Sequence, residues 1–322
     1  DLGRTFVELY GAGAANVTIL ELLKMRGGLQ DYDDALYQNK TFRGEEYVPT
    51  RVVGDAPHDL HCAPGACGVY SSVGYLLLGL AAATARNLSD WRALDQGALA
   101  FGGDPGPGLV FPVRGACADV PGVVHQYATR VGNGTYGWFD VIGDSCLNAW
   151  TAGNLAATTQ DLARFWHRLF DGTLLSAASL AAMTSFEPLT WGWFPGLEYG
   201  AGLMAQAWAA ANGTYSLPVL GHGGEDYGSE TALNGYVAAL NASVVLASTS
   251  YDGANCSLSL AENAYAKDFA ACFAYDRILH AINPAFPRLR CKPADALAAV
   301  SYTHLRAHET KANLVCRLLL EK

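Results

Sequence analysis

The pattern of hydrophobic and polar positions predicts helices in the first two thirds of the chain and strands mainly after residue 199. Leucine and isoleucine recur at helical spacing over residues 17–25, and Gly27 and Gly28 follow as a pair that ends a helix. A long apolar stretch over residues 68–86 predicts a second helix, mostly buried.

Two further helices are expected before the strands begin. Thr158 can cap the first of them, with Asp161 reaching back as in a capping box, and a shorter helix is expected over residues 176–184. Before Thr158, the Pro/Gly-rich residues 104–108 predict a turn, and residues 109–149 are loop-rich with short possible strands.

The pattern then changes to short runs rich in Val, Thr and Ser, which is typical of strands. Strands are expected over residues 199–206, 217–221, 231–240 and 243–250, followed by a long helix over 258–282. Helices, then antiparallel strands, then a closing helix predict an α+β fold: an antiparallel sheet flanked by helices, with a mainly helical subdomain.

Composition restricts the class of protein. The chain has 322 residues, 51% hydrophobic and 16% charged, which is typical of a folded globular protein. The net charge of −9 and the lack of a basic stripe argue against nucleic acid as a partner. The longest apolar run, residues 73–83, is too short to span a bilayer, so a buried helix is expected there and no membrane span.

Asparagine and cysteine usage indicates a secretory compartment. Seven of the thirteen asparagines lie in Asn-x-Ser/Thr sequons, which predicts a glycoprotein that is secreted or in the secretory-pathway lumen. The eight cysteines show no CxxC pair and no histidines at zinc spacing, so disulfides are expected and no metal. The sequons are Asn16, Asn39, Asn87, Asn133, Asn212, Asn241 and Asn255.

Three disulfide pairings are plausible from the spacing. Cys62 and Cys67 flank a short loop, and Cys117 and Cys146 bracket one loop-rich segment. Cys272 with Cys291 is more plausible than Cys256 with Cys272, because one straight helix would hold the latter two about 24 Å apart.

Residues 301–322 differ from the rest of the chain. They carry four Lys/Arg against two Asp/Glu, whereas the rest carries 17 against 28, and the string resembles translated sequencing-adaptor read-through. An amphipathic C-terminal helix is the alternative. We expect a domain over residues 1–300 and a non-native tail over 301–322, which removes Cys316 and leaves an odd number of cysteines.

Two motifs suggest chemistry. Residues 70–79, YSSVGYLLLG, place a phenol beside two hydroxyls at the start of an apolar helix, and residues 221–224, GHGG, place an imidazole where glycines allow close approach to the backbone. With residues 17–29 and 152–165, they resemble, in order, four segments of the class C beta-lactamase-like serine hydrolases, within the serine beta-lactamase and penicillin-binding-protein superfamily.

The resemblance implies roles for five residues. Tyr70 would be the catalytic base that shuttles the proton. Ser72 stands where the family has Asn, and a hydroxyl can make only part of that residue's hydrogen bonds. His222 would orient the substrate, and the N–H of Glu225, just past Gly224, would form half of the oxyanion hole. Taken singly, Tyr70 and His222 would be interpreted as structural, and Ser71 and Ser72 as helix caps; the ordered set favours function for Tyr70 and His222.

The nucleophile motif S-x-x-K is absent, because no serine in the chain has a lysine three residues later. In the family this motif lies about fifty residues before the segment matched by residues 17–29. We therefore expect an N-terminally truncated chain that lacks the first strands and the nucleophile helix and is inert as it stands.

The leading functional hypothesis is a secreted serine hydrolase that forms an acyl-enzyme, acting on a small-molecule ester or peptide without a cofactor, as an esterase, peptidase or beta-lactamase-like enzyme. The alternative is a non-catalytic binding or scaffold protein of the same fold, which the departures at Gly27 and Ser72 favour. A metalloenzyme comes third, because the eight histidines are scattered.

Overall fold

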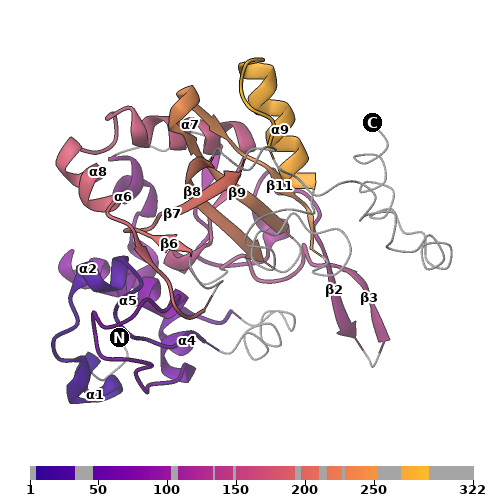
Figure 1. The fold of residues 1–322 in the computed structure, drawn as a ribbon. Coiled ribbons are helices and arrows are strands. Elements are labelled where there is room, and N and C mark those ends of the chain that lie inside the picture. Colours follow the sequence, from indigo (N-terminus) through magenta and orange to yellow (C-terminus); the bar gives the residue numbers. More distant parts are fainter. Residues whose placement is uncertain are drawn as a thin grey trace. The chain divides into compact units, whose positions relative to one another are not determined.

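Figure 1 shows the fold in the computed structural model. The chain forms two compact units. The first comprises residues 1–124 and 142–205, and the second comprises 125–141 and 206–322. The structure describes residues 5–32, 46–102, 108–132, 135–147, 150–192, 197–209, 216–226, 229–251 and 270–289.

The first unit begins with short helices that are capped by threonine side chains. Helix α1 (Phe6–Tyr10) and helix α2 (Ile19–Leu23) each start at a threonine that forms a capping box with the glutamate three residues later. A 3-10 turn, η1 (Ala12–Ala14), lies between them. The helix expected over residues 17–25 is present but shorter. It starts after the cap at Thr18, and it ends before Met25, which adopts a φ of 58°.

Helix α5 (Ser72–Ala85) is the long apolar helix of this unit and packs beside α2 and α4 (Pro49–Asp55). It begins four residues later than the apolar stretch predicts. Residues 68–71 are extended instead, because Val69 forms a parallel bridge with Trp191. Tyr70 therefore precedes the helix.

Helix α7 (Thr159–Phe170) begins, as expected, after a cap at Thr158, and α8 (Ala177–Met183) follows a cap at Ser176. Asp161 reaches back to the Thr158 hydroxyl at 2.6 Å, while the Thr158 N–H donates to Gly108. The remaining short elements of the unit are η2 (Trp91–Ala93), α6 (Gln96–Phe101), β1 (Leu109–Val110), η3 (Cys117–Asp119), η4 (Trp150–Ala152) and β4 (Ala156–Ala157), with β1 and β4 antiparallel.

The strand expected over residues 199–206 is interrupted. Strand β6 (Glu198–Tyr199) pairs with β5 (Glu187–Pro188) and with the start of β7 (Met204–Ala209), and residues 200–203 turn between β6 and β7. At Gly200 a Cβ atom would lie 2.2 Å from the Met183 carbonyl oxygen, so only glycine fits this close approach.

The second unit is mainly antiparallel. Strand β9 (Ser229–Val237) pairs with β8 (Ser216–Asp226), β10 (Ala242–Val244) and β11 (Ala247–Ser248). The hairpin of β2 (Tyr127–Gly132) and β3 (Thr135–Asp140) is joined by β12 (Ser250–Tyr251), which is parallel to β2. The 3-10 turn η5 (Ala238–Leu240) follows β9, and α9 (Ala270–Ile282) follows the strands.

This arrangement confirms the predicted α+β class with antiparallel sheets and helices. The strand expected over residues 243–250 is instead divided among β10, β11 and β12. Of the helix expected over 258–282, the described part is α9. Residues 103–107 and the expected tail over 301–322 lie outside the described residues.

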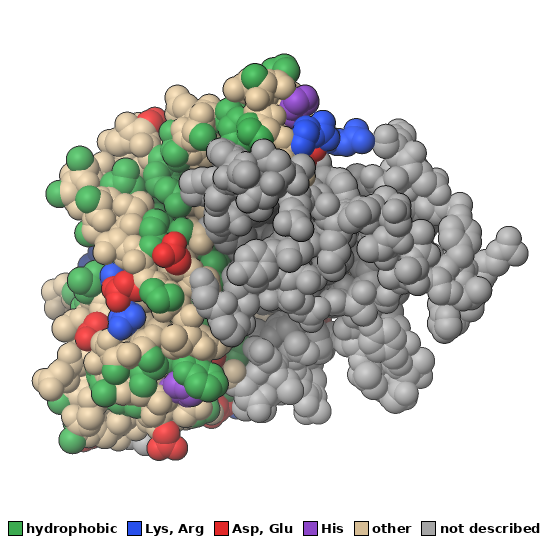
Figure 2. Space-filling model, in the orientation of Figure 1, with side chains coloured by type: hydrophobic (Ala, Val, Ile, Leu, Met, Phe, Trp, Pro, Cys, Tyr) green, Lys and Arg blue, Asp and Glu red, His purple; other side chains and the backbone are tan. Residues whose placement is uncertain are grey.

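The surface contains both charge signs. On the face drawn in Figure 2, acidic and basic side chains lie interspersed among hydrophobic and polar ones. No helix in the described ranges is both long enough and apolar enough to cross a membrane.

Candidate active site

Tyr70 lies on a short extended segment whose backbone is held on both sides. Its own N–H donates to the carbonyl oxygen of Trp191 at 3.0 Å. The N–H of Val69 donates to the Met25 carbonyl at 2.8 Å, and that of Ser71 lies 3.3 Å from the Met25 sulfur. The sequence motif therefore adopts a fixed backbone path before α5 begins.

The first turn of α5 is capped from a distant part of the chain. The N–H groups of Ser72 and Val73 both point at Oδ1 of Asp31, at 2.9 and 3.4 Å. Ser71 occupies the N-cap position but makes no side-chain cap bond; its buried hydroxyl donates to the Gln30 carbonyl at 3.0 Å. The simple capping role considered for the two serines is thus taken by Asp31.

Three phenols lie close together in this unit. The rings of Tyr70 and Tyr199 meet edge to face with centroids 6.0 Å apart. Tyr75 donates its hydroxyl to the Leu23 carbonyl at 2.7 Å. Burial raises the pKa of Tyr75 to about 12, against the smaller opposing effect of a hydrogen bond with Tyr199.

Tyr199 is fully buried, and burial together with the neighbouring Tyr75 and Tyr70 phenols raises its pKa well above the ordinary value. Tyr75 and Tyr199 therefore stay neutral at physiological pH and act as packing and hydrogen-bonding groups. Tyr70, like Tyr75, is only partly buried, whereas Tyr199 is not exposed to a ligand.

Glycine is required next to Tyr70. Gly192 has a φ of +85°, and a Cβ atom there would lie 2.6 Å from the Cβ of Tyr70. The backbone at Gly192 can therefore lie directly beside the tyrosine.

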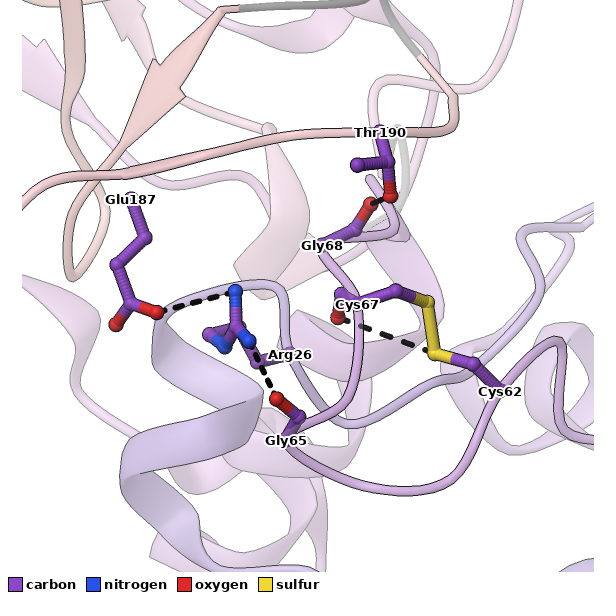
Figure 3. Close-up of a disulfide and its surroundings, with 7 residues drawn as sticks. All are labelled: Arg26, Cys62, Gly65, Cys67, Gly68, Glu187 and Thr190. Carbon is purple, nitrogen blue, oxygen red and sulfur yellow. Dashed lines mark hydrogen bonds and ion pairs between the residues drawn. A yellow bond between two sulfur atoms is a disulfide. The ribbon is translucent and has the colours of Figure 1, made fainter.

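An ion-pair cluster joins the turn after α2 to β5, and Figure 3 shows the pair that Glu187 forms with Arg26. Glu187 pairs with Lys24 and, at 3.1 Å, with Arg26, whose guanidinium also donates to the Gly65 carbonyl. The hydrogen bond from Lys24, with the positive charge of Arg26, holds the pKa of Glu187 below its usual range. The motif over residues 17–29 thus fixes the backbone at the start of the extended segment that holds Tyr70.

The disulfide loop packs on the same turn. Cys62 and Cys67 are bonded, and the His61 and Gly65 N–H groups donate to the Gly28 and Arg26 carbonyls, both at 2.8 Å. The second bond, Cys117–Cys146, also forms as expected. Cys291 lies outside the described residues, so the third pairing stays a prediction.

His222 lies on β8 opposite Asn234 of β9. Its ring Nδ1 approaches the Gly223 carbonyl oxygen, so the proton belongs on Nδ1 and Nε2 is left as an acceptor. Burial lowers the pKa of His222 to about 4, with the Gly223 carbonyl opposing. The imidazole is therefore neutral at physiological pH.

The strand register shifts between His222 and Gly224, after which Gly224 faces Thr231 and Glu225 faces Glu230. Such an irregularity redirects the backbone where it occurs. At Gly221 a Cβ atom would lie 1.7 Å from the Asn234 carbonyl oxygen, so the first glycine of GHGG serves the close approach of β8 and β9.

The five predicted site residues fall into two groups. Tyr70 and Ser72 belong to the first unit, where they lie within one turn of each other; His222, Gly224 and Glu225 belong to the second, where they follow one another on β8. Asp31 and Tyr199 were not predicted, because no spacing rule links either to residues 70–73. Within the described ranges, no group of three His, Cys, Asp or Glu side chains could hold a metal ion.

The sequence of this chain matches the model of a known protein family. The family model described as Beta-lactamase aligns with residues 4–257, most of the chain. The chain belongs to the beta-lactamase family. No curated protein sequence matches it.

Several solved structures are similar to this chain in fold. D-amino acid amidase from Ochrobactrum anthropi SV3, complexed with D-phenylalanine, aligns with a TM-score of 0.64 at 21% identity, covering 89% of this chain and 78% of that one. The D-stereospecific amidohydrolase from Streptomyces sp. gives 0.59 at 22%, covering 78% and 75%. The penicillin-binding protein from Bacillus halodurans gives 0.56 at 17%, covering 79% and 74%.

Proposed function

We propose that this chain is part of a secreted serine hydrolase that works through an acyl-enzyme, with Tyr70 as the base and a small-molecule ester, amide or peptide as substrate. The observation that carries the proposal is the backbone of Tyr70, which is fixed on both sides by Met25 and Trp191 in a member of the beta-lactamase family. Positioning of this kind is what general-base catalysis requires.

The substrate class is supported by the names of proteins with similar structures. Two of the similar structures are named as an amidase and an amidohydrolase, and one contains D-phenylalanine. An acyl carbon attached to nitrogen or oxygen fits the same mechanism: a serine attacks, the base takes its proton, and the proton then passes to the leaving group.

In the proposal, the nucleophile comes from an S-x-x-K sequence that precedes Asp1 in the longer protein. His222 orients the substrate as a neutral imidazole, and the Glu225 N–H stabilises the oxyanion. Ser72 replaces part of the hydrogen bonding of the family's asparagine.

The test uses the full-length protein, with a serine-reactive phosphonate probe and a chromogenic ester. We expect a covalent adduct on the serine of an upstream S-x-x-K and no adduct on the 322-residue chain alone. A full-length protein without this motif and without an adduct would instead support the non-catalytic binding or scaffold protein favoured by Gly27 and Ser72.

Tyr70→Phe tests the base directly. It removes only the hydroxyl, so we expect kcat to fall by about a hundredfold or more, within the usual range for a lost proton-transfer group. Tyr47→Phe is the control, because it also removes one phenol hydroxyl, which in Tyr47 donates to Asp55 at 2.7 Å. Equal turnover in the two variants would reject Tyr70 as the base.

Secretion is part of the proposal and has its own support. The three sequon asparagines in described ranges, Asn16, Asn87 and Asn241, are all exposed. Tyr236 bonds the side-chain oxygen of Asn241, which leaves the nitrogen to carry a glycan. We expect the protein purified from a eukaryotic secretory host to lose mass on glycosidase treatment. An unchanged mass would reject secretion as part of the proposal.

A further inference from the structure

Helix α5 has an unusual N-terminal cap. In α1, α2, α7 and α8 the cap side chain is at the N-cap residue itself. In α5 the N-cap is Ser71, whose hydroxyl donates to Gln30 instead, and the cap oxygen comes from Asp31, 41 residues before Ser72.

Asp31 completes a series of hydrogen bonds along the segment that carries Tyr70. Every N–H from residue 69 to residue 73 has an acceptor outside the segment. Met25 and Trp191 hold the first three, and Asp31 alone holds the last two. The path of the segment is thus fixed as far as Ser71 by Met25 and Trp191, and beyond Ser71 by one carboxylate.

The charge of Asp31 suits this position. A helix N-terminus carries unpaired N–H groups and a partial positive charge, which stabilise a nearby carboxylate. Oδ1 of Asp31 also accepts from the Tyr32 N–H at 3.0 Å, which fixes its side chain at the turn.

We propose that Asp31 is a positioning residue for Tyr70: by accepting the N–H groups of Ser72 and Val73, it sets the angle at which the extended segment enters α5 and so the place of the phenol. The proposal rests on the proposed function for its kinetic consequence only. Its structural consequence can be measured whether or not the protein is a hydrolase.

Three substitutions in the full-length protein separate geometry from charge. Asp31→Asn keeps the acceptor oxygen and removes the charge, whereas Asp31→Glu keeps the charge and moves the oxygen by one methylene. Asp31→Ala removes both. We expect Asp31→Asn to keep kcat within about threefold, and Asp31→Glu and Asp31→Ala to lower it between about tenfold and a hundredfold with KM within about twofold.

Asp95→Ala is the matched control. Asp95 caps α6 through the Ala98 N–H at 2.8 Å, so its loss removes a bond of the same kind elsewhere in the unit. It should leave kcat unchanged. Equal kcat in Asp31→Glu and the wild type would overturn the proposal, as would equal losses in Asp31→Asn and Asp31→Glu.

A second measurement needs no activity. Hydrogen exchange at the Ser72 and Val73 amides, and the ring ¹³C shift of Tyr70 assigned with Tyr70→Phe, are compared in the same variants. Faster exchange and a moved Tyr70 signal in Asp31→Glu, with neither change in Asp31→Asn or Asp95→Ala, support the proposal even if the wild type hydrolyses nothing, which would reject only the proposed function. Unchanged exchange and an unchanged signal in Asp31→Glu would overturn it.

Discussion

Gly28 shows how one residue holds the candidate site together. It has a φ of +75°, and a Cβ atom there would lie 2.2 Å from the Cys62 carbonyl oxygen. Its own carbonyl accepts the His61 N–H. The turn after α2 and the disulfide loop can therefore touch only because this position lacks a side chain.

Gly28→Ala should lower the free energy of unfolding by about 2 kcal/mol or more, because strain and a backbone clash add. Gly54→Ala is the control: in α4 it meets nothing within 4 Å and has an ordinary φ. It should raise stability by up to about 1 kcal/mol. Urea unfolding of both variants measures the difference; equal effects would contradict the assigned role of Gly28.

The buried imidazole of His222 is expected to make the free energy of unfolding depend on pH. Its folded pKa of about 4 lies below the ordinary 6.5, so the unfolded chain binds the proton more tightly. The His222 contribution is present in full above pH 6.5 and is lost as the pH falls toward 4, by roughly 1–3 kcal/mol.

Unfolding free energies of the wild type and His222→Gln, measured from pH 7 to pH 4, test this. The wild type should lose more stability over that range than the variant, because only it gains the proton at residue 222 on unfolding. Parallel curves would show that the buried imidazole does not titrate as expected.

At the scale of elements, the two disulfides differ in what they constrain. Cys62–Cys67 closes a separation of 5 residues and Cys117–Cys146 one of 29. Chain entropy alone predicts that removing the longer link costs about 3.5 kcal/mol and the shorter about 2 kcal/mol. The short loop, however, also packs on the turn that leads to Tyr70.

We therefore expect Cys117→Ala/Cys146→Ala to lower the thermal midpoint more than Cys62→Ala/Cys67→Ala does. Under the proposed function, kcat should respond in the opposite order, because the short loop contacts Arg26 and Gly28. Calorimetry and kinetics on both double variants check the two orders. The same order in both measurements would contradict this distinction.

At the scale of the whole molecule, the family match ends at residue 257 and the described residues at 289. The charge balance of residues 301–322 differs from that of the rest. We expect removal of residues 301–322 to leave the thermal midpoint within about 1 °C, because a non-native tail would contribute nothing to the stability of the fold. A drop of several degrees would show that the tail belongs to the fold.

Much of the fold could be predicted from local signals. Thr18, Thr158 and Ser176 each cap a helix that the spacing of apolar residues predicted. The start of α5 and the break at Gly200 were missed for one reason: each depends on a partner far along the chain. Trp191 holds residues 69 and 70 extended, and Met183 leaves no room for a side chain at residue 200.

The sequence by itself determined the α+β class, the helix capped by Thr158 and the order of motifs that indicated the family, and it made the Cys62–Cys67 and Cys117–Cys146 disulfides plausible. These follow from periodicity, cap chemistry and spacing, which act over a few residues or survive as pattern. Only the tertiary structure decided that Asp31 caps the helix after Tyr70 and that Tyr199 packs on its ring. Hydrogen bonds and ring contacts between residues 41 or 129 positions apart leave no period in the sequence, because the fold alone brings them together.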